Sequence, residues 1–357
     1  MSLFKDMLGS GESLLRNPVA LDYDFIPKLV PYRENEQFRM ASCIKPLFQE
    51  RNGRNLVIWG RPGVGKTVAC RHVLADLGEQ TDEIVPFYVN CWNKNTSFKI
   101  VVELCEQLGY RLTHNKKTDE LLEIAVKILN KSSSVLVFDE IDKVEEFDFL
   151  YSLLEGVYRK SIILITNYKE WSVTLDERIR SRLLPEILEF RQYNLSETKG
   201  ILKTRLEAGV APDVFDEAGF ELIVAKTAEL GDIRSGLYLI REAVNIAEDK
   251  SLKKVSADFV REAITKLDEF KTKKTADLEE ETQKILELIK KNSGNKIGEL
   301  FKLYQDNGGA MVYKSFQRKI AKLEGGRFIS VEKVMGGKEG TTSIISYSGA
   351  AKKLTDF

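Results

Sequence analysis

The chain has 357 residues, of which 43% are hydrophobic and 30% are charged, and its 54 basic and 54 acidic side chains give a net charge of zero. This length allows two or three compact units, and this balance is typical of globular proteins in water. No apolar run approaches the roughly 20 residues that cross a bilayer, and residues 1–15 lack the apolar centre of a secretion signal. The composition therefore argues against a membrane protein and favours a cytoplasmic one.

The sulfur-containing and imidazole side chains do not indicate a metal or disulfide framework. The four cysteines, Cys43, Cys70, Cys91 and Cys105, lie far apart, and the chain holds only two histidines. No cysteine pair has the C-x-x-C spacing that structural zinc or redox sites use. We therefore expect reduced and mostly buried thiols, and we look for function in other residue types.

Four short apolar runs, rich in β-branched residues, follow one another between residues 54 and 190. They are residues 55–60 (NLVIWG), 86–90 (PFYVN), 134–140 (SVLVFDE) and 161–167 (SIILITN). Segments of helical length separate them, for example residues 68–78 and 118–130. Continuous apolar strands joined by helical crossovers are typical of a parallel sheet that is covered on both faces. This part of the chain is therefore predicted to be an α/β domain.

Residues 194–267 have a wholly helical pattern. Apolar side chains recur at spacings of three and four in residues 195–209, 220–231 and 236–249. Ser196 and Asp232 are candidates for the caps of helix N-termini, and Gly209 and Gly231 are candidates for helix stops. The pattern predicts an all-helical domain after the α/β domain.

The charged residues 268–281 are poor in apolar side chains and are predicted to connect the helical domain to a last unit. Three helical stretches follow, at residues 282–292, 296–307 and 312–324, and then two strand-like runs around a turn at Gly336 and Gly337. Three helices followed by a β-hairpin indicate a winged-helix unit. We therefore predict domains at residues 1–190, 191–270 and 271–357.

Residues 60–67 read GRPGVGKT, a complete G-x-x-x-x-G-K-[ST] loop between a predicted strand and a predicted helix. Its glycines let backbone N–H groups approach phosphates, and the helix presents the positive end of its dipole. Lys66 would reach the β- and γ-phosphates, and the hydroxyl of Thr67 would coordinate Mg²⁺. The loop predicts binding of ATP or ADP by Gly60, Pro62, Gly63, Val64, Gly65, Lys66, Thr67 and Val68.

Asp139 and Glu140 end the apolar run 134–140, and Asn167 ends the next run. The carboxyl ends of parallel strands form the sheet edge where α/β proteins bind phosphates. At this edge Asp139 would hold the hydrated Mg²⁺, and Glu140 would orient or deprotonate the attacking water. Asn167 would hold that water against the γ-phosphate. These residues predict that the protein is an ATPase.

Together with Ser181, Arg182 and the segment 231–234 (GDIR), these residues resemble the AAA+ superfamily. The resemblance implies that Asn167 is the sensor 1 residue. It also implies that Arg234, at the start of a helix in the lid domain, is the sensor 2 residue.

The same resemblance implies that Arg182 is the arginine finger, which reaches the nucleotide of a neighbouring subunit. Arg178 and Arg180 lie close to it in the sequence and remain alternatives. A finger neutralises charge that develops in phosphoryl transfer, but only when it is held in position. We therefore expect slow, switch-like hydrolysis in the absence of a partner.

From about residue 22 to its end, the chain resembles the archaeal origin-recognition initiators, relatives of the origin recognition complex and its helicase-loading factor. Residues 27–34 (PKLVPYRE) are similar to the family segment that lies against the adenine. Residues 88–91 (YVNC), with the helical insertion that follows through about residue 110, are similar to its initiator-specific motif. Residues 190–193 and 202–205 match its lid. The resemblance implies further nucleotide contacts from Val30, Pro31, Arg33, Tyr193, Arg205 and Arg234.

The third helix of the predicted winged-helix unit, residues 312–323, is the element that enters the major groove of DNA in such units. Phe316, Ile320 and Leu323 recur at spacings of four and three and should face the core. Residues 310–338 hold seven basic and two acidic side chains. The candidate contacts with duplex DNA are Lys314, Ser315, Gln317, Arg318 and Lys322 on the helix, with Arg327, Lys333 and Lys338 beyond it.

The resemblance implies a second DNA contact at the insertion, which family members use to widen or bend the duplex. Its polar and basic residues are Asn93, Lys94, Asn95 and Lys99. The apolar residues that follow, Val101, Val102, Leu104 and Leu108, should pack against the sheet.

We therefore predict an archaeal type of ATP-dependent replication initiator, nucleoid-associated, that binds origin DNA and recruits or loads the replicative helicase. A second copy or a paralogous initiator is a further expected partner. The same parts also suit a AAA+ ATPase of a mobile element or plasmid, or an ATP-dependent transcriptional regulator. They also suit a protein-remodelling AAA+ ATPase whose winged helix docks proteins. Gene neighbourhood, and stimulation of the ATPase by DNA or by protein, would distinguish these functions.

Overall fold

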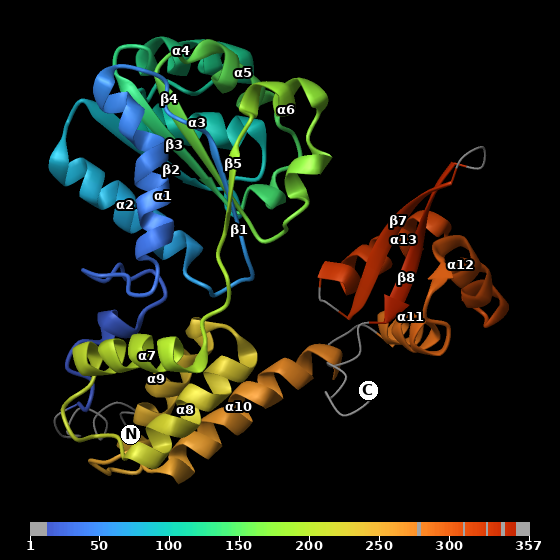
Figure 1. Cartoon of the computed structure of the whole chain (residues 1–357). Helices are drawn as coiled ribbons and strands as arrows, with labels where there is room; N and C mark the ends of the chain where they lie inside the picture. Colours follow the sequence, from blue (N-terminus) through green and yellow to red (C-terminus); the bar gives the residue numbers. More distant parts are fainter. Residues whose placement is uncertain (1–12, 277–279, 310, 326–327, 337–339, 348–357) are drawn as a thin grey trace. The chain divides into compact units, whose positions relative to one another are not determined.

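The computed structural model describes residues 13–276, 280–309, 311–325, 328–336 and 340–347. The chain forms two compact units, Met1–Ile264 and Thr265–Phe357. The first unit contains a five-stranded sheet and a group of helices, and the second contains a three-stranded sheet and further helices (Figure 1). This division does not test the boundaries at residues 190 and 270, which stay predictions.

The sheet of the first unit is parallel, with the strand order β2-β3-β4-β1-β5. Its strands are β1 (Leu56–Trp59), β2 (Ile84–Asn90), β3 (Ser133–Asp139), β4 (Lys160–Thr166) and β5 (Glu186–Glu189). The predicted parallel sheet and four of its strands are confirmed. The sequence pattern does not predict β5, because this four-residue edge strand is bounded by two glutamates and buries only Leu188 fully.

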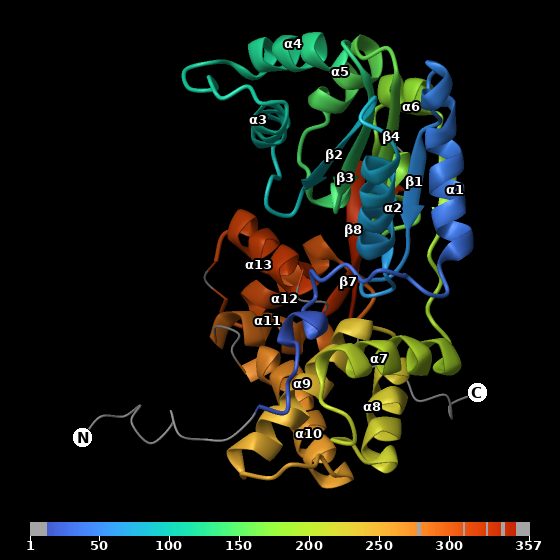
Figure 2. The ribbon, with the colours of Figure 1, turned by 90° about the vertical axis from the view of Figure 1, so that its left-hand side faces the viewer.

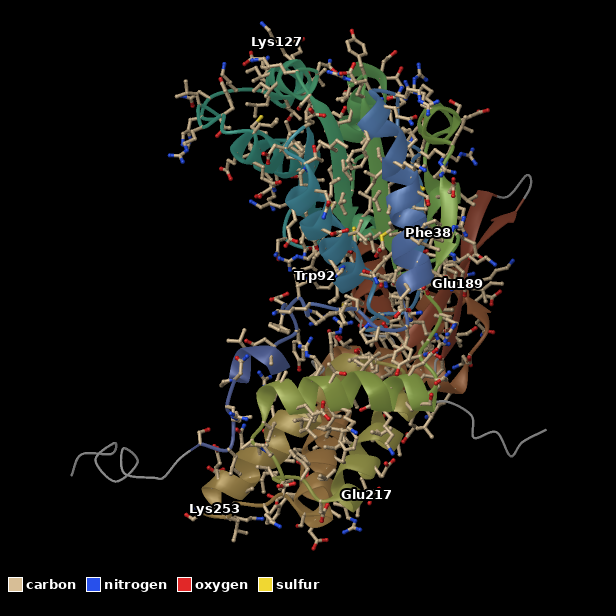
Figure 3. All side chains as sticks on the ribbon, turned by 60° about the vertical axis from the view of Figure 1, so that its left-hand side comes forward. Phe38, Trp92, Lys127, Glu189, Glu217 and Lys253 are labelled. Atoms are coloured by element: carbon tan, nitrogen blue, oxygen red, sulfur yellow. The ribbon has the colours of Figure 1, made fainter. Side chains whose placement is uncertain are left out.

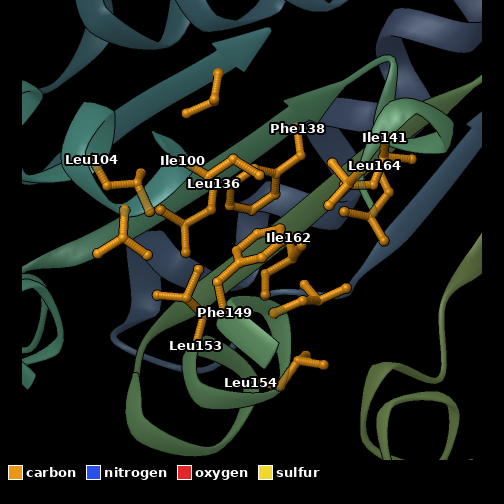
Figure 4. Packing of buried hydrophobic residues seen from close by; sticks show 14 of the residues in the cluster. Ile100, Leu104, Leu136, Phe138, Ile141, Phe149, Leu153, Leu154, Ile162 and Leu164 are labelled. Atoms are coloured by element: carbon orange, nitrogen blue, oxygen red, sulfur yellow. The ribbon is translucent and has the colours of Figure 1, made fainter. Parts of the chain in front are cut away.

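Helices cover both faces of this sheet (Figure 2). On one face lie α1 (Glu34–Ile44) and α2 (Lys66–Gln80), and on the other α3 (Ser97–Gln107), α4 (Thr118–Leu129), α5 (Asp148–Gly156) and α6 (Glu177–Leu183). Successive side chains of a strand point to opposite faces. Val135 and Val137 therefore pack with α1 and α2, whereas Leu136 and Phe138 pack with Phe149 of α5 in the cluster of Figure 4.

Four helices follow the sheet and are here called the lid: α7 (Leu195–Gly209), α8 (Glu217–Leu230), α9 (Ile233–Asp249) and α10 (Ala257–Ala276). Asn194 caps α7, because its side chain accepts the N–H of Glu197 while the Glu197 carboxylate accepts the N–H of Asn194. The prediction that Ser196 is the cap is wrong, since Ser196 already lies in the first turn. Asp232 caps α9 and Gly231 ends α8 in a left-handed conformation, as predicted.

The last helix of the lid is longer than the sequence indicates. Because α10 continues to Ala276, most of the segment predicted as a connection at residues 268–281 is helical. Within the described ranges, every helix is too short or too polar to cross a lipid bilayer.

The second unit contains α11 (Glu280–Lys291), α12 (Ile297–Asp306) and α13 (Tyr313–Gly325). Its antiparallel sheet has the order β6-β8-β7, with β6 (Asn295–Lys296), β7 (Ile329–Gly336) and β8 (Gly340–Tyr347). Phe316, Ile320 and Leu323 of α13 are buried in its core, together with Leu300 and Ile345. This confirms the predicted inward face of α13 and the three helices with a hairpin that a winged helix requires.

We expect Glu197 to make the free energy of unfolding of the first unit depend on pH in the acid range. Hydrogen bonds from Arg191 hold the pKa of Glu197 at about 2, below its ordinary 4.5. Because the pKa is lower in the folded state, this stabilisation is complete above about pH 4.5 and is lost as the pH falls toward about 2. The difference in free energy of unfolding between wild type and Glu197→Gln should therefore shrink over that range, measured by denaturant titration. The exposed Glu207→Gln on the same helix is the control, and a difference that does not change with pH would contradict this role.

Candidate nucleotide site

The phosphate-binding loop runs from β1 to α2 and lies against the lid. Gly63 and Gly65 have φ angles of 77° and 87°, in the left-handed region that favours glycine. A Cβ atom on Gly63 would lie 1.9 Å from Oδ1 of Asp232, and one on Gly65 would lie 2.6 Å from the hydroxyl of Tyr193. The N–H of Ile233 also donates to the Gly63 carbonyl at 3.3 Å. These two glycines thus permit both the turn of the loop and its close contact with the lid.

Lys66 begins α2, and its ammonium group is buried among oxygen acceptors. The residue is 6% exposed, and Nζ donates to the carbonyls of Gly60 at 2.7 Å and Arg61 at 3.0 Å and to Oδ1 of Asn167 at 2.9 Å. Burial lowers the pKa of Lys66 to about 8, although nearby carboxylates, above all Glu140, act in the opposite direction. The amine is therefore fixed at the loop, with a pKa close to the physiological range.

Asp139 ends β3 with both carboxylate oxygens accepting hydrogen bonds. The residue is 2% exposed; Oδ2 accepts from the hydroxyls of Thr67 at 2.6 Å and Tyr88 at 2.7 Å, and Oδ1 accepts from the Glu140 N–H at 2.8 Å. Mg²⁺ prefers oxygen ligands and binds through one or two carboxylates together with substrate phosphates. The oxygen atoms of Thr67 and Asp139, which lie together beside the loop, are ligands of the kind that fits this ion. The described part of the chain holds no larger cluster of metal-binding side chains.

Glu140 and Asn167 are joined by a hydrogen bond across the ends of β3 and β4. Nδ2 of Asn167 donates to Oε2 of Glu140 at 2.6 Å, while its Oδ1 accepts from Lys66. Burial, followed by the charges of neighbouring aspartates, raises the pKa of Glu140. Sequence reasoning missed Asp142, whose carboxylate accepts from the Thr166 hydroxyl at 3.0 Å and the Asn167 N–H at 3.2 Å. Hydrogen bonds thus hold both the side chain and the backbone N–H of Asn167 at the end of β4.

A cavity of about 350 Å³ lies between the loop and the lid. The predicted residues that line it are Val30, Pro31, Pro62, Gly63, Gly65, Lys66, Thr67, Val68, Asp139, Glu140, Asn167, Tyr193, Arg205 and Arg234. Sequence reasoning missed other lining residues, among them Tyr23, Asp24, Arg71, Tyr88, Ile201 and Thr204. These come from ordinary strand, helix and loop positions, so no local pattern distinguishes them.

Three predicted nucleotide-binding residues, Arg33, Gly60 and Val64, do not line this cavity. Arg33 is fully buried behind the loop, where its guanidinium donates to the carbonyls of Val64 and Arg191. It also lies 4.0 Å from the centre of the Tyr193 ring. Arg33 therefore supports the loop and the connection to the lid from behind.

The predicted sensor 2 and finger arginines lie in different surroundings. Arg234, in the first turn of α9, lines the cavity, and its Nε donates to Oδ1 of Asp232 at 3.2 Å. Arg182 on α6 does not line it. Its guanidinium lies 4.7 Å from the centre of the Tyr151 ring and 3.5 Å from Oε1 of Glu155. The neighbouring Arg178 and Arg180 are exposed on the same helix, so all three remain candidates for the finger.

The candidate DNA contacts of the first unit surround the start of α3. Asn93 and Lys99 are exposed, Lys94 pairs with Glu103 at 3.0 Å, and Nζ of Lys99 donates to Oδ1 of Asn95 at 3.1 Å. The apolar residues behind them pack as predicted, with Val101 and Leu104 fully buried and Val102 and Leu108 partly buried. Trp92, labelled in Figure 3, is 65% exposed beside them. The insertion therefore presents polar, basic and aromatic side chains to solvent.

In the second unit, α13 exposes Lys314, Gln317, Arg318 and Lys322, and Ser315 is half-buried. Lys333 lies in β7 opposite Ser343 of β8. The predicted contacts Arg327 and Lys338 lie outside the described residues. The basic side chains that the sequence assigns to the outer face of α13 are thus exposed.

The strand order, the loop after β1, the acids at the end of β3, the asparagine after β4 and the helical lid define a AAA+ ATPase. Two family models agree. One described as an AAA domain matches residues 49–170, and one described as a Cdc6 AAA+ ATPase-type lid domain matches residues 199–265.

Comparison with individual proteins identifies the family. The chain is 32% identical to ORC1-type DNA replication protein 1 of Sulfurisphaera tokodaii, over 71% of this chain and 67% of that protein. It is 29% identical to ORC1-type DNA replication protein 1 of Methanothermobacter thermautotrophicus, over 100% and 99% of the two chains. The Aeropyrum pernix ORC1 protein, solved in complex with DNA, superposes with a TM-score of 0.73 at 25% identity, with 94% of each chain covered. The chain belongs to the family of ORC1-type DNA replication proteins.

We expect nucleotide binding to be linked to proton uptake by Lys66. Phosphate groups beside Nζ favour the charged amine, so binding raises the pKa of Lys66 above about 8. Near pH 8 the complex then holds up to about half a proton more than its separate components, and affinity falls as the pH rises further. Calorimetric titration with ADP in two buffers of different ionisation enthalpy measures this uptake.

The matched variant for this experiment is Lys66→Arg, which keeps the positive charge but does not titrate in this range. Its binding enthalpy should be the same in both buffers. Equal enthalpies for the wild type, or an affinity that does not change between about pH 7 and about pH 9, would contradict the lowered pKa of Lys66.

Proposed function

We propose that this chain is an ATP-controlled replication initiator that binds duplex DNA at an origin and recruits or helps to load the replicative helicase. The observation that carries this proposal is the combination of a cavity at the phosphate-binding loop with a basic, exposed α13 in one chain of the ORC1-type family. The DNA complex of the Aeropyrum pernix relative supports the choice of ligand.

In the proposed reaction, Lys66 binds the β- and γ-phosphates of ATP, and Thr67 and Asp139 hold Mg²⁺, which neutralises phosphate charge when bound. Asn167 orients the attacking water, because its amide lies between Lys66 and Glu140. Glu140 accepts a proton from this water as its oxygen bonds to the γ-phosphorus. The bond from that phosphorus to the β–γ bridging oxygen breaks, and ADP and phosphate leave.

Arginines from the lid and from a neighbouring chain complete the proposed switch. Arg234 lies on the lid helix that packs against the loop, so its contact with phosphate couples the lid to the nucleotide. Arg182 does not line the cavity of its own chain, which is compatible with a finger that acts on the nucleotide of a second copy or a paralogous initiator. Hydrolysis by the isolated chain is then slow and resets the initiator.

For DNA, Gln317 and Arg318 on α13 have the side chains that read adenine and guanine edges, whereas Lys314 and Lys322 meet phosphates. The insertion around Asn93 and Lys99 supplies the second contact. The winged helix and the insertion thus provide two separate points of contact with the duplex.

We expect Glu140→Gln to separate hydrolysis from binding. The amide keeps the size of the carboxylate but cannot accept a proton from water, so turnover should fall by about 100-fold or more. ATP affinity should change by less than about threefold, because the loop and Lys66 are unchanged. Phosphate release and equilibrium ATP binding measure the two quantities. Glu146→Gln, an exposed acid in the same segment, is the control. Unchanged turnover in Glu140→Gln would refute the assigned base.

We expect Lys314→Ala with Arg318→Ala to weaken DNA binding by at least about tenfold, because both a base contact and a phosphate contact are lost. The test is recovery and sequencing of sheared genomic DNA bound by the protein with ATP or ADP, at two salt concentrations. The matched control is Lys253→Ala with Lys254→Ala, which removes the same charge from the exposed end of the lid (Figure 3).

Each outcome of this selection identifies one function. Enrichment at one chromosomal region, lost in the α13 variant but kept in the control, supports the initiator. Enrichment at transposon ends or promoters supports the ATPase of a mobile element or the transcriptional regulator. Uniform recovery that falls steeply with salt indicates phosphate attraction alone. No retained DNA refutes DNA binding and leaves protein remodelling.

A further inference from the structure

Tyr88 of β2 reaches the Asp139 carboxylate diagonally across two neighbouring strands. In the parallel register, Tyr88 lies opposite Val137, and Asn90 lies opposite Asp139. Tyr88, Val137 and Asp139 therefore share the face of the sheet that α2 covers. Diagonal neighbours on one face are within reach of an aromatic side chain. The hydroxyl of Tyr88 accordingly donates to Oδ2 of Asp139 at 2.7 Å.

Two side-chain hydroxyls hold the Asp139 carboxylate, and they come from different parts of the site. Thr67 donates to the same oxygen at 2.6 Å, but its hydroxyl belongs to the phosphate-binding loop and is the group that would coordinate Mg²⁺. A hydroxyl that coordinated the ion through a lone pair would keep its hydrogen for Asp139, whereas Tyr88 would hold the same carboxylate from β2, outside the phosphate-binding loop. A carboxylate that is 2% exposed requires such donors, because an unpaired buried charge is costly.

Tyr88 is itself held on several sides. The guanidinium of Arg71, from α2, lies 5.4 Å from the centre of its ring. On the outer edge of β2, Nε2 of Gln107 donates to the Tyr88 carbonyl at 2.9 Å, and Oε1 of Gln107 accepts the Tyr88 N–H at 3.4 Å. Gln107 belongs to α3, the helix of the insertion, and it supplies the partners that an edge strand otherwise lacks. The hydroxyl of Tyr88 is therefore placed by the fold rather than by Asp139 alone.

We propose that Tyr88 is a positioning residue for the metal site, where it orients the Asp139 carboxylate toward Mg²⁺ bound with ATP. This inference rests on the proposed ATPase function. Tyr88 has no role in proton transfer and acts through Asp139. Groups that orient a metal-binding side chain in this way typically contribute 10–100-fold to metal affinity or activity.

The test is Tyr88→Phe in the full chain, which removes the hydroxyl and keeps the ring in its packing. Binding of the fluorescent analogue mant-ATP is titrated in EDTA and at a series of Mg²⁺ concentrations. Without Mg²⁺ the variant should bind as the wild type does. The Mg²⁺ concentration for half-maximal enhancement should rise by about tenfold, and the Mg²⁺ dependence of phosphate release should shift by the same factor. Tyr110→Phe, outside the cavity in the same unit, is the matched control.

The outcomes distinguish this inference from the function on which it rests. A Mg²⁺ dependence in Tyr88→Phe that equals the wild type overturns the role of Tyr88 and leaves the ATPase intact. Equal losses of affinity in EDTA and in Mg²⁺ also overturn it, because Tyr88 would then shape the whole cavity. A wild type that binds no mant-ATP under any condition refutes the proposed ATPase itself.

Discussion

The nucleotide site depends on the hydrogen bonds that hold the buried ammonium group of Lys66. A charge with 6% exposure is stable only among acceptors, and here these come from the loop carbonyls of Gly60 and Arg61 and from Asn167 after β4. The bond to Lys66 fixes which end of the Asn167 amide faces the loop. Its nitrogen must then face Glu140. One amide thus aligns the amine of Lys66 with the carboxylate of Glu140.

A second buried charge supports the same loop from the opposite side. The Arg33 guanidinium contacts the loop at Val64, the connection to the lid at Arg191, and the ring of Tyr193. Tyr193 in turn places its hydroxyl against Gly65. A movement of the lid connection therefore disturbs the contacts of Arg33 with the loop. The resemblance implies a nucleotide contact from Arg33, whereas the structure buries this side chain behind the loop and outside the cavity.

The sequence predicted those parts of the fold and site whose signals are local. The loop at residues 60–67 is defined by spacing, and Asp139, Glu140 and Asn167 follow apolar runs that form buried strands. The strand β5 was missed because this edge strand has no continuous apolar pattern. The cap Asn194 was missed because Ser196, two residues later, is also a polar residue suited to cap the same helix. Tyr88 was missed for a different reason. Inside an apolar run it has the pattern of a core residue, and only the register with β3 brings its hydroxyl to Asp139.

The segment after β3 contacts both Asn167, at the end of β4, and the insertion. It begins with Glu140, and Asp142 accepts the N–H of Asn167. The Nζ atom of Lys143 lies 5.3 Å from the centre of the Trp92 ring and 5.8 Å from the centre of the Tyr168 ring. Farther along, the N–H of residue 145 donates to the carbonyl of residue 95, and the carbonyl of residue 146 accepts from the hydroxyl of residue 97. A displacement of the insertion must therefore also strain the segment that begins with Glu140. Because packed interiors transmit such strain, these contacts couple the surface around Trp92 mechanically to the pair of Glu140 and Asn167.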